Sequence, residues 1–357
     1  MRLGIIGLPS AGKTTLFNAL TGGHLPTGEV HAPGRIDVHT AVADVPDERL
    51  EALSRLFRPR KTTHAKVTYA DIGGLRAAVG REGLAGPLLN HLSQMEGFVH
   101  VVRAFEDPAV PHPDGRVDPV RDLAALEAEF VLNDMLTAER RLERLKEERQ
   151  KVMRDRAVID REAALWERVA HDLNQQRALR SASFTAEEER MLSGFGLLSR
   201  TPMLVVVNLA EGGVLPALEA PTPRTQVLGL QGKLEMEIAQ MPPDEAADFL
   251  REYGIDEPGR LKVIRASYDL LGLHSFFTVG EDEVKAWTLS RGATALEAAD
   301  TIHTDLARGF IRAEVIPWDQ MLEMETLARA RSEARLRSEG KDYVVADGDV
   351  VHIKFNV

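Results

Sequence analysis

The feature that most constrains the fold is the segment Gly7–Thr14, which reads GLPSAGKT. It matches the pattern G-x-x-x-x-G-K-[S/T] of a phosphate-binding loop at every fixed position. The apolar run Leu3–Ile6 before it predicts a short buried strand, and Leu16 and Leu20 after it have helical spacing. A strand, a glycine-rich turn and a helix in this order place a helix amino terminus beside bound phosphate. We therefore expect the chain to bind a nucleoside triphosphate together with Mg²⁺.

The fixed positions of this loop have separate chemical roles. Gly12 lets the backbone curl so that its amide groups point toward phosphate oxygens. Lys13 is expected to contact the β- and γ-phosphates, and the Thr14 hydroxyl to bind Mg²⁺. Three neighbours are expected to contact phosphate as well, namely Ser10, Ala11 and Thr15.

The composition narrows the class of protein. The chain has 357 residues, enough for about two or three domains, and 44% of them are apolar. With 55 acidic and 44 basic residues the net charge is −11, so we expect no duplex DNA partner. The sequence has no cysteine, which excludes disulfides and is compatible with a reducing compartment. Because the sequence shows no leader and no long apolar run, we expect the protein to be cytoplasmic and monomeric and not to bind membranes.

Strand-like and helical segments alternate along much of the chain. Apolar runs recur at Leu3–Ile6, Val67–Tyr69, Phe98–Val102, Met203–Val207 and Gln226–Leu230. Continuous apolar runs are typical of strands that are covered on both faces. The alternation predicts an α/β fold with a doubly wound, mostly parallel sheet.

Two regions depart from that alternation. Residues 121–180 contain no glycine or proline and predict two long antiparallel helices, with a turn near residues 154–158. The last eighty or so residues contain short strand-like runs, which predict a small α+β domain. We therefore divide the chain into a nucleotide-binding domain (1–121 and 192–275), a helical coiled-coil insert (122–191) and a C-terminal domain (276–357).

A second motif is expected on the metal side of the site. Residues 71–74 read DIGG and follow a strand-like run, and D-x-x-G behind a phosphate loop is typical of nucleotide switch proteins. We expect Asp71 to hold Mg²⁺ through water and the Gly74 amide to contact the γ-phosphate.

Base recognition is expected at the end of a later strand. Asn208, Leu209 and Glu211 occupy the place where guanine-specific proteins carry N-K-x-D. Glu211 is one methylene longer than the aspartate that accepts two hydrogen bonds from guanine, and Leu209 replaces the lysine. Asn208 can both donate and accept, which suits adenine. The sequence therefore favours ATP over GTP, with Leu209 packed on the base.

A second base-contacting loop is expected after the run Gln226–Leu230. Gln231 and Gly232 stand at this position.

These motifs together resemble the YchF, or Obg-like ATPase, family of translation-factor-class P-loop proteins. The resemblance covers essentially the whole chain and includes C-terminal stretches such as IHTD at 302–305 and GFIRA at 309–313. It implies a C-terminal ubiquitin-like TGS domain, binding of ATP in preference to GTP, slow hydrolysis to ADP, and association with the ribosome in the cytoplasm.

The residues that would assist hydrolysis depart from common patterns. Leu75 stands where Ras-like proteins have a glutamine that orients the attacking water. His112, in a proline-rich loop, is a candidate to position that water. Arg35 aligns with the family's Mg²⁺-binding switch threonine, and Ser10 with an asparagine linked to monovalent-ion dependence. We expect strong nucleotide binding with impaired hydrolysis, unless Arg35 acts as an internal arginine finger.

Three functions are compatible with these residues. The first is a slow ATPase switch that acts with the ribosome. The second is a GTPase of the same architecture that binds GTP and GDP. The third is a hydrolysis-deficient ribosome- or RNA-binding module that holds nucleotide structurally. Basic C-terminal residues could face RNA in any of these cases: Arg291, Arg308, Arg312, Lys341 and Lys354.

Overall fold

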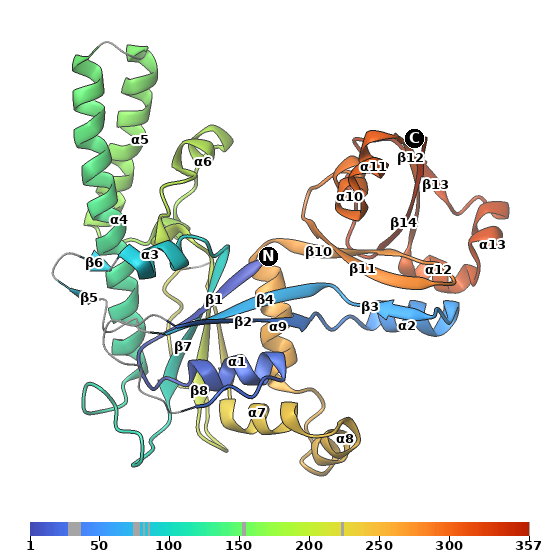
Figure 1. Cartoon of the computed structure of the whole chain (residues 1–357), viewed down its shortest axis with the longest axis horizontal. Coiled ribbons are helices and arrows are strands. Elements are labelled where there is room, and N and C mark those ends of the chain that lie inside the picture. The colour runs from blue at the N-terminus through green and yellow to red at the C-terminus, as the bar shows by residue number, and fades with distance from the viewer. Residues whose placement is uncertain are drawn as a thin grey trace. The chain divides into compact units, whose positions relative to one another are not determined.

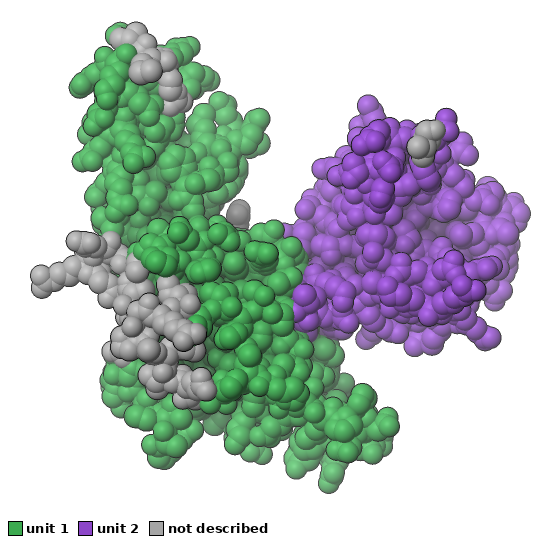
Figure 2. All heavy atoms as spheres, viewed as in Figure 1, with its two compact units in different colours: residues 1–41, 68–263 green, residues 42–67, 264–357 purple. Residues whose placement is uncertain are grey.

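The computed structural model describes residues 1–27, 37–73, 79–80, 83–84, 86–151, 155–222 and 225–356. The chain forms two compact units, shown in green and purple in Figure 2. The first comprises Met1–Ala41 and Thr68–Val263, and the second comprises Val42–Val67 and Ile264–Val357. The second unit thus includes a segment, residues 42–67, that the sequence boundaries assign to the nucleotide-binding domain. The three-part division stays a prediction.

The first unit is built on a six-stranded sheet with the order β2-β4-β1-β7-β8-β9 (Figure 1). Its strands are β1 (Arg2–Ile6), β2 (Val38–Asp44), β4 (Lys66–Ile72), β7 (Gly97–Ala104), β8 (Met203–Leu209) and β9 (Gln226–Leu230). From β4 through β9 every neighbouring pair is parallel. All five apolar runs found in the sequence are strands of this sheet, and the predicted α/β class is confirmed.

The sheet order locates the place where a ligand can bind. After β1 the chain forms β4 on one side of it, and later forms β7 on the other side. In open α/β sheets, ligands bind beyond the carboxyl ends of the strands at such a reversal of strand order. The reversal here lies between β1 and β7, directly beyond which the glycine-rich loop begins.

Helices flank these strands along the chain. In the first unit they include α1 (Lys13–Thr21), α3 (Gly86–Leu92), α7 (Gly232–Gln240) and α8 (Pro243–Glu252), and α9 (Gly259–Leu270) begins in the first unit and continues into the second. The short strands β5 (Val79–Gly80) and β6 (Gly83–Leu84) pair with each other. Helix α1 buries Leu16, Phe17 and Leu20, as their helical spacing predicts. None of the helices in the described ranges is both long and apolar enough to cross a membrane.

The inserted helices form the expected hairpin. Helix α4 (Pro119–Gln150) and helix α5 (Arg156–Asn174) lie side by side in Figure 1 and share an apolar core around Trp166. The predicted turn at residues 154–158 is placed too late, because α5 begins at Arg156 with Asp155 as its amino-terminal cap. Thr185 and Glu188 form a capping box at the start of α6 (Ala186–Leu192).

A buried carboxylate ties the hairpin to the segment that enters β8. The side chain of Asp134, on α4, accepts hydrogen bonds from the backbone amides of Leu198 (2.9 Å) and Ser199 (2.7 Å) and from the Ser199 hydroxyl (2.6 Å). Burial is the larger influence on this carboxyl and raises its pKa to about 6, although these hydrogen bonds oppose the shift. Ionising Asp134 in the folded chain therefore costs free energy, while its hydrogen bonds fix α4 to the segment before β8.

We predict a pH-dependent stability difference at Asp134. Because the pKa is raised from 3.8 to about 6, stability is largest when the carboxyl is protonated and is lost as pH rises through that interval. The loss should amount to about 2 kcal/mol between pH 4 and pH 7. Urea unfolding of the wild type and of Asp134→Asn at both pH values measures it, with Glu139→Ala on the same helix as an exposed control. Equal wild-type and Asp134→Asn pH profiles would contradict it.

The second unit is built on another six-stranded sheet, with the order β13-β12-β14-β10-β11-β3. Its elements are β3 (Lys61–Thr63), β10 (Leu273–Thr278), β11 (Glu283–Ser290), β12 (Phe310–Pro317), β13 (Arg337–Glu339), β14 (Asp349–Phe355), α2 (Glu48–Phe57), α10 (Ala295–Ile302), α11 (Thr304–Arg308), α12 (Trp318–Met324) and α13 (Leu327–Ser332). The strand-like run at residues 343–345 is not a strand and makes only an isolated bridge, from Val344 to Thr294. The runs in β11 and β14 are strands as expected.

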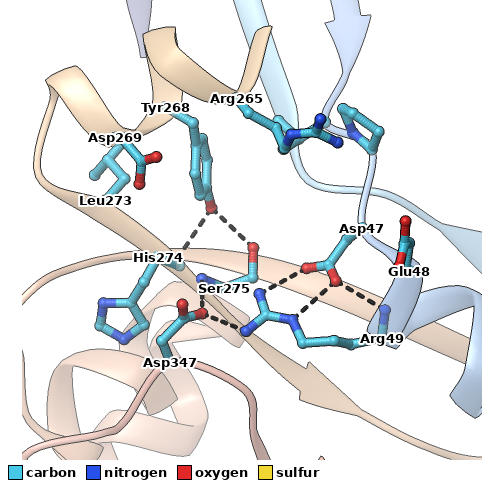
Figure 3. A pocket seen from close by; sticks show the side chains of 12 residues that line it. Asp47, Glu48, Arg49, Arg265, Tyr268, Asp269, Leu273, His274, Ser275 and Asp347 are labelled. Atoms are coloured by element: carbon cyan, nitrogen blue, oxygen red, sulfur yellow. Dashed lines mark hydrogen bonds and ion pairs between the residues drawn. The ribbon is translucent and has the colours of Figure 1, made fainter. Parts of the chain in front are cut away.

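Residues 42–67 are held in this second unit by strand pairing and by a charged cluster. Strand β3 pairs in parallel with β11. The Arg49 guanidinium donates to Asp47 (2.8 Å) and to Asp347 (2.9 Å), two residues far apart in the sequence. This cluster lines a cavity of about 330 Å³, in which the Tyr268 hydroxyl donates to the carbonyl of His274 (Figure 3). Since Arg49 already has acidic partners, the cavity has no free cation there.

Candidate functional site

The backbone of the glycine-rich loop adopts conformations that explain its glycines. Gly7 and Gly12 have φ values of 148° and 94°, in a region that favours glycine. A side chain at Gly7 would collide with the backbone carbonyl of Val101 on β7, which cannot move aside. Ser10 is also left-handed, with φ 60°. The loop is thus packed closely on the neighbouring strand.

Lys13 lies inside the loop that precedes it. Its Nζ donates to the carbonyls of Gly7 (3.1 Å) and Leu8 (3.0 Å). Burial is the main cause that lowers the pKa of this ammonium to about 8, and the negative charge of Asp71 acts in the opposite direction. A buried cation of this kind is stabilised by an anionic ligand such as a phosphate.

The two residues predicted to bind metal meet across the sheet. The Thr14 hydroxyl, at the start of α1, donates to Asp71 Oδ2 at the end of β4 over 2.7 Å. The second carboxylate oxygen, Oδ1, is buried and has no hydrogen-bond partner among the described residues. An oxygen pair of this kind fits Mg²⁺, which typically takes few protein ligands and fills its remaining positions with water and phosphate oxygens.

No group of three or more His, Cys, Asp or Glu side chains suited to a metal occurs within the described residues. The site would therefore hold Mg²⁺ mainly through Thr14 and Asp71. Gly74, predicted to contact the γ-phosphate, and Arg35 lie outside the described residues, so their roles stay predictions.

Asn208 contacts one other predicted base residue, Gly232, and the phosphate loop. Its side-chain amide Nδ2 donates to the Ala11 carbonyl (3.0 Å), and its Oδ1 accepts from the Gly232 amide (3.0 Å). A side chain at Gly12 would collide with Nδ2, and a Cβ at Gly232 would lie 2.7 Å from Oδ1. Asn208 therefore connects the phosphate loop to the loop after β9.

This arrangement alters the interpretation of Asn208. Each end of its amide makes one bond to backbone, so Asn208 holds two loops together, and each end keeps a further donor or acceptor site. Its predicted base contact stays a prediction. Leu209 is half-buried at the end of β8, Glu211 is exposed beyond it, and Gln231 caps α7.

His112 is not placed to activate water. Its Nε2 donates to Asp122 Oδ2 (2.8 Å), and its Nδ1 accepts from the Asp114 amide (3.1 Å). The ring is buried, with 2% of its side chain exposed. Both nitrogens are therefore engaged in holding the proline-rich loop on the first turn of α4. The catalytic interpretation from sequence overlooked this carboxylate partner, ten residues along the chain.

We predict that His112→Ala weakens the fold without changing hydrolysis. Removing the ring leaves the buried Asp122 carboxylate with fewer partners, which should cost about 2–4 kcal/mol of unfolding free energy. Turnover at saturating ATP, counted per folded molecule, should stay within about twofold of wild type, since both ring nitrogens are already occupied. Urea unfolding and single-turnover ATP hydrolysis test the two statements. A loss of turnover in a fully folded variant would restore the catalytic role.

One buried residue near the site, Arg103, belongs to none of the nucleotide-binding motifs found in the sequence. Arg103, near the end of β7, is 1% exposed and lies in register with Asn208. Its signal in the sequence is a positive charge next to the last residue of a largely apolar strand.

The comparison with protein families matches both ends of the chain. Residues 2–138 match a family described as 50S ribosome-binding GTPase. Residues 273–356 match the C-terminal domain of YchF GTPases, described as a protein of unknown function.

Curated relatives cover the whole chain. The ribosome-binding ATPase YchF of Bacillus subtilis is 38% identical over 365 residues, which span 99% of this chain and 99% of the relative. The corresponding protein of Pasteurella multocida is 36% identical over 100% of this chain and 99% of its own. Obg-like ATPase 1 of rice, Oryza sativa subsp. japonica, is 35% identical over 100% of this chain and 92% of its own.

A solved structure has the same architecture. The YchF GTPase of Schizosaccharomyces pombe superposes with a TM-score of 0.84 at 28% identity, covering 99% of this chain and 97% of the yeast chain. The helical insertion and the C-terminal β/α domain are therefore part of a shared fold.

Proposed function

We propose, because this chain belongs to the YchF family of P-loop nucleoside triphosphatases, that it hydrolyses ATP to ADP and phosphate and that its nucleotide state controls binding to the ribosome. The observation that carries the proposal is the meeting of Thr14 and Asp71 beside the buried ammonium of Lys13. Relatives named as ribosome-binding ATPases span the whole chain and support the partner. A ribosome-binding role in turn favours a cytoplasmic location.

The residues of the site would have separate roles in binding and hydrolysis. Lys13 neutralises charge on the β- and γ-phosphates, and the amides of residues 10–15 bind phosphate oxygens at the start of α1. Thr14 and Asp71 would hold Mg²⁺, which when bound neutralises charge on the phosphates. Water attacks the γ-phosphorus and ADP leaves. Leu75 stands where Ras-like proteins have the glutamine that orients the attacking water, and it cannot hydrogen-bond water, which favours slow hydrolysis.

Selectivity for ATP rests on the end of β8 and the loop after β9. Glu211 is longer than the aspartate of guanine-specific proteins, and Leu209 offers an apolar surface for the base. A site without a paired partner for guanine loses discrimination in its favour. We therefore place adenine above guanine, with GTP hydrolysis as the alternative.

Side-by-side titration tests this function. We expect ADP to bind at least about tenfold more tightly than GDP, a difference of about 1.4 kcal/mol. ATP turnover should be slow alone and should change when ribosomes are added. Tighter GDP binding would support the GTPase, and normal ATP binding without turnover above background, even with ribosomes, would support the structural-nucleotide module.

The effect of Arg35 can be measured in the same assay. If the arginine has simply replaced a metal-binding threonine, Arg35→Thr should hydrolyse ATP faster than wild type in a single turnover. A much slower variant would instead identify Arg35 as an internal arginine finger.

A further inference from the structure

We propose that Arg103 is a positioning residue of the nucleotide site, which sets the spacing between the phosphate loop and the loop that follows β7. The inference rests on the proposed nucleotide binding.

Arg103 lies where the sheet topology places a ligand. Strand β7 lies beside β1, with Ile6 in register with His100. Arg103 stands three residues further along β7, in register with Asn208 of β8. It is therefore at the carboxyl ends of the strands, at the reversal of strand order, between the phosphate loop and the residues expected to bind the base.

The guanidinium donates to three backbone carbonyls, two in the loop after β7 and one in the phosphate loop. Its Nε donates to the Phe105 carbonyl (3.0 Å), one terminal nitrogen to the Val110 carbonyl (2.7 Å) and the other toward the Ser10 carbonyl (3.5 Å). Its central carbon also lies 4.4 Å from the centre of the Phe105 ring. The contact to Ser10 is the longest, and it reaches a residue held in the left-handed conformation.

The charge of Arg103 is unusual for so buried a group. Within the described ranges, its hydrogen-bond acceptors are backbone carbonyls and no carboxylate pairs with it, although only 1% of the residue is exposed. Buried charges in proteins are normally paired. A second buried cation, Lys13, lies in the same loop region, so an anionic ligand would meet a site that already carries positive charge.

The shape of the side chain matters as much as its charge. A guanidinium offers donors in a fixed planar fork, whereas a lysine ammonium is a point charge on a flexible stem. Only the fork can reach Phe105, Val110 and Ser10 at once. Lysine at this position should therefore fail to hold the two loops at their spacing, even though it retains the charge.

The test compares Arg103→Lys and Arg103→Met with wild type, using ADP titration by calorimetry and thermal unfolding without nucleotide. Arg180→Met is the matched control, because Arg180 is also a buried arginine of the first unit but pairs with Glu127 (2.6 Å) at the base of the hairpin. We expect both Arg103 variants to lose about 10- to 100-fold in ADP affinity. Arg180→Met should lose thermal stability but keep ADP affinity.

The ADP affinities of these variants decide whether Arg103 positions the nucleotide site. Wild-type ADP affinity in both Arg103 variants would overturn it while leaving the proposed function intact, as would an equal loss in Arg180→Met. Full retention in Arg103→Lys alone would also overturn it, because charge rather than positioning would then be sufficient. If Arg103→Met does not fold, Arg103→Lys decides alone. A wild type that binds no ADP would remove the proposed function itself.

Discussion

Replacing Lys13 with alanine is expected to lower ADP affinity by at least about 100-fold, the largest effect of any single substitution in this chain. The ammonium lies inside the loop, where it donates to the carbonyls of Gly7 and Leu8. Loss of the side chain removes the positive charge that phosphate would meet. Calorimetric titration with ADP measures the loss, and Lys146→Ala, an exposed lysine on α4, should bind as wild type does.

The same residue predicts how binding depends on pH. Burial lowers the pKa of Lys13 to about 8 in the nucleotide-free protein, and phosphate binds the protonated form. ADP affinity should therefore be level below pH 7 and fall as pH rises through 8, by about tenfold between pH 7 and pH 9. A binding profile for wild type that is flat over this range would contradict the assignment. The small residual affinity of Lys13→Ala should show no such decline.

Replacing Asn208 with alanine should reduce the affinities for ADP and GDP by the same factor, about tenfold or more. The substitution leaves the buried Gly232 amide and the Ala11 carbonyl without partners, and thereby loosens the phosphate loop from the loop after β9. The two lost hydrogen bonds should also lower the unfolding free energy by about 2–4 kcal/mol.

The ratio of the two affinities separates positioning from base reading. If Asn208 reads the base directly, the ratio of ADP to GDP affinity should change markedly in Asn208→Ala. If it positions the loops, the ratio should be preserved while both affinities fall. Asn90→Ala, on the exposed face of α3, serves as the control for truncation of an asparagine in the same unit.

Sequence reasoning was most successful where the information is local. The five apolar runs are strands, the capping box at Thr185 forms, and the loop Gly7–Thr14 joins a strand to a helix. Local hydrophobic pattern and turn chemistry are properties of neighbouring residues, so a single sequence carries them. The capping residue Asp155, which sets the start of α5, was missed because it competes with several other polar residues in the turn.

Assignments of side-chain roles were less reliable because they depend on partners distant in the chain. Asn208 fits a base-reading motif, and the sequence does not show that its amide also donates to Ala11, 197 residues away. His112 has the chemistry of a general base, but its ring is buried and both nitrogens already have partners, Asp122 and the Asp114 amide. Likewise, no local sequence pattern in residues 42–67 predicts that β3 pairs with β11.

The ligand class, the α/β fold and the family can be inferred from the amino-acid sequence alone, since a phosphate loop and its switch motif consist of contiguous residues whose chemistry is local. The side-chain contacts that hold the site together are seen only in the folded chain. Thr14 meets Asp71 because β1 and β4 are neighbours, and Arg103 spans two loops because β7 lies at the reversal of strand order. Hydrogen bonds act over about 3 Å in space, whatever the separation in sequence, so these partners become visible only in the folded chain.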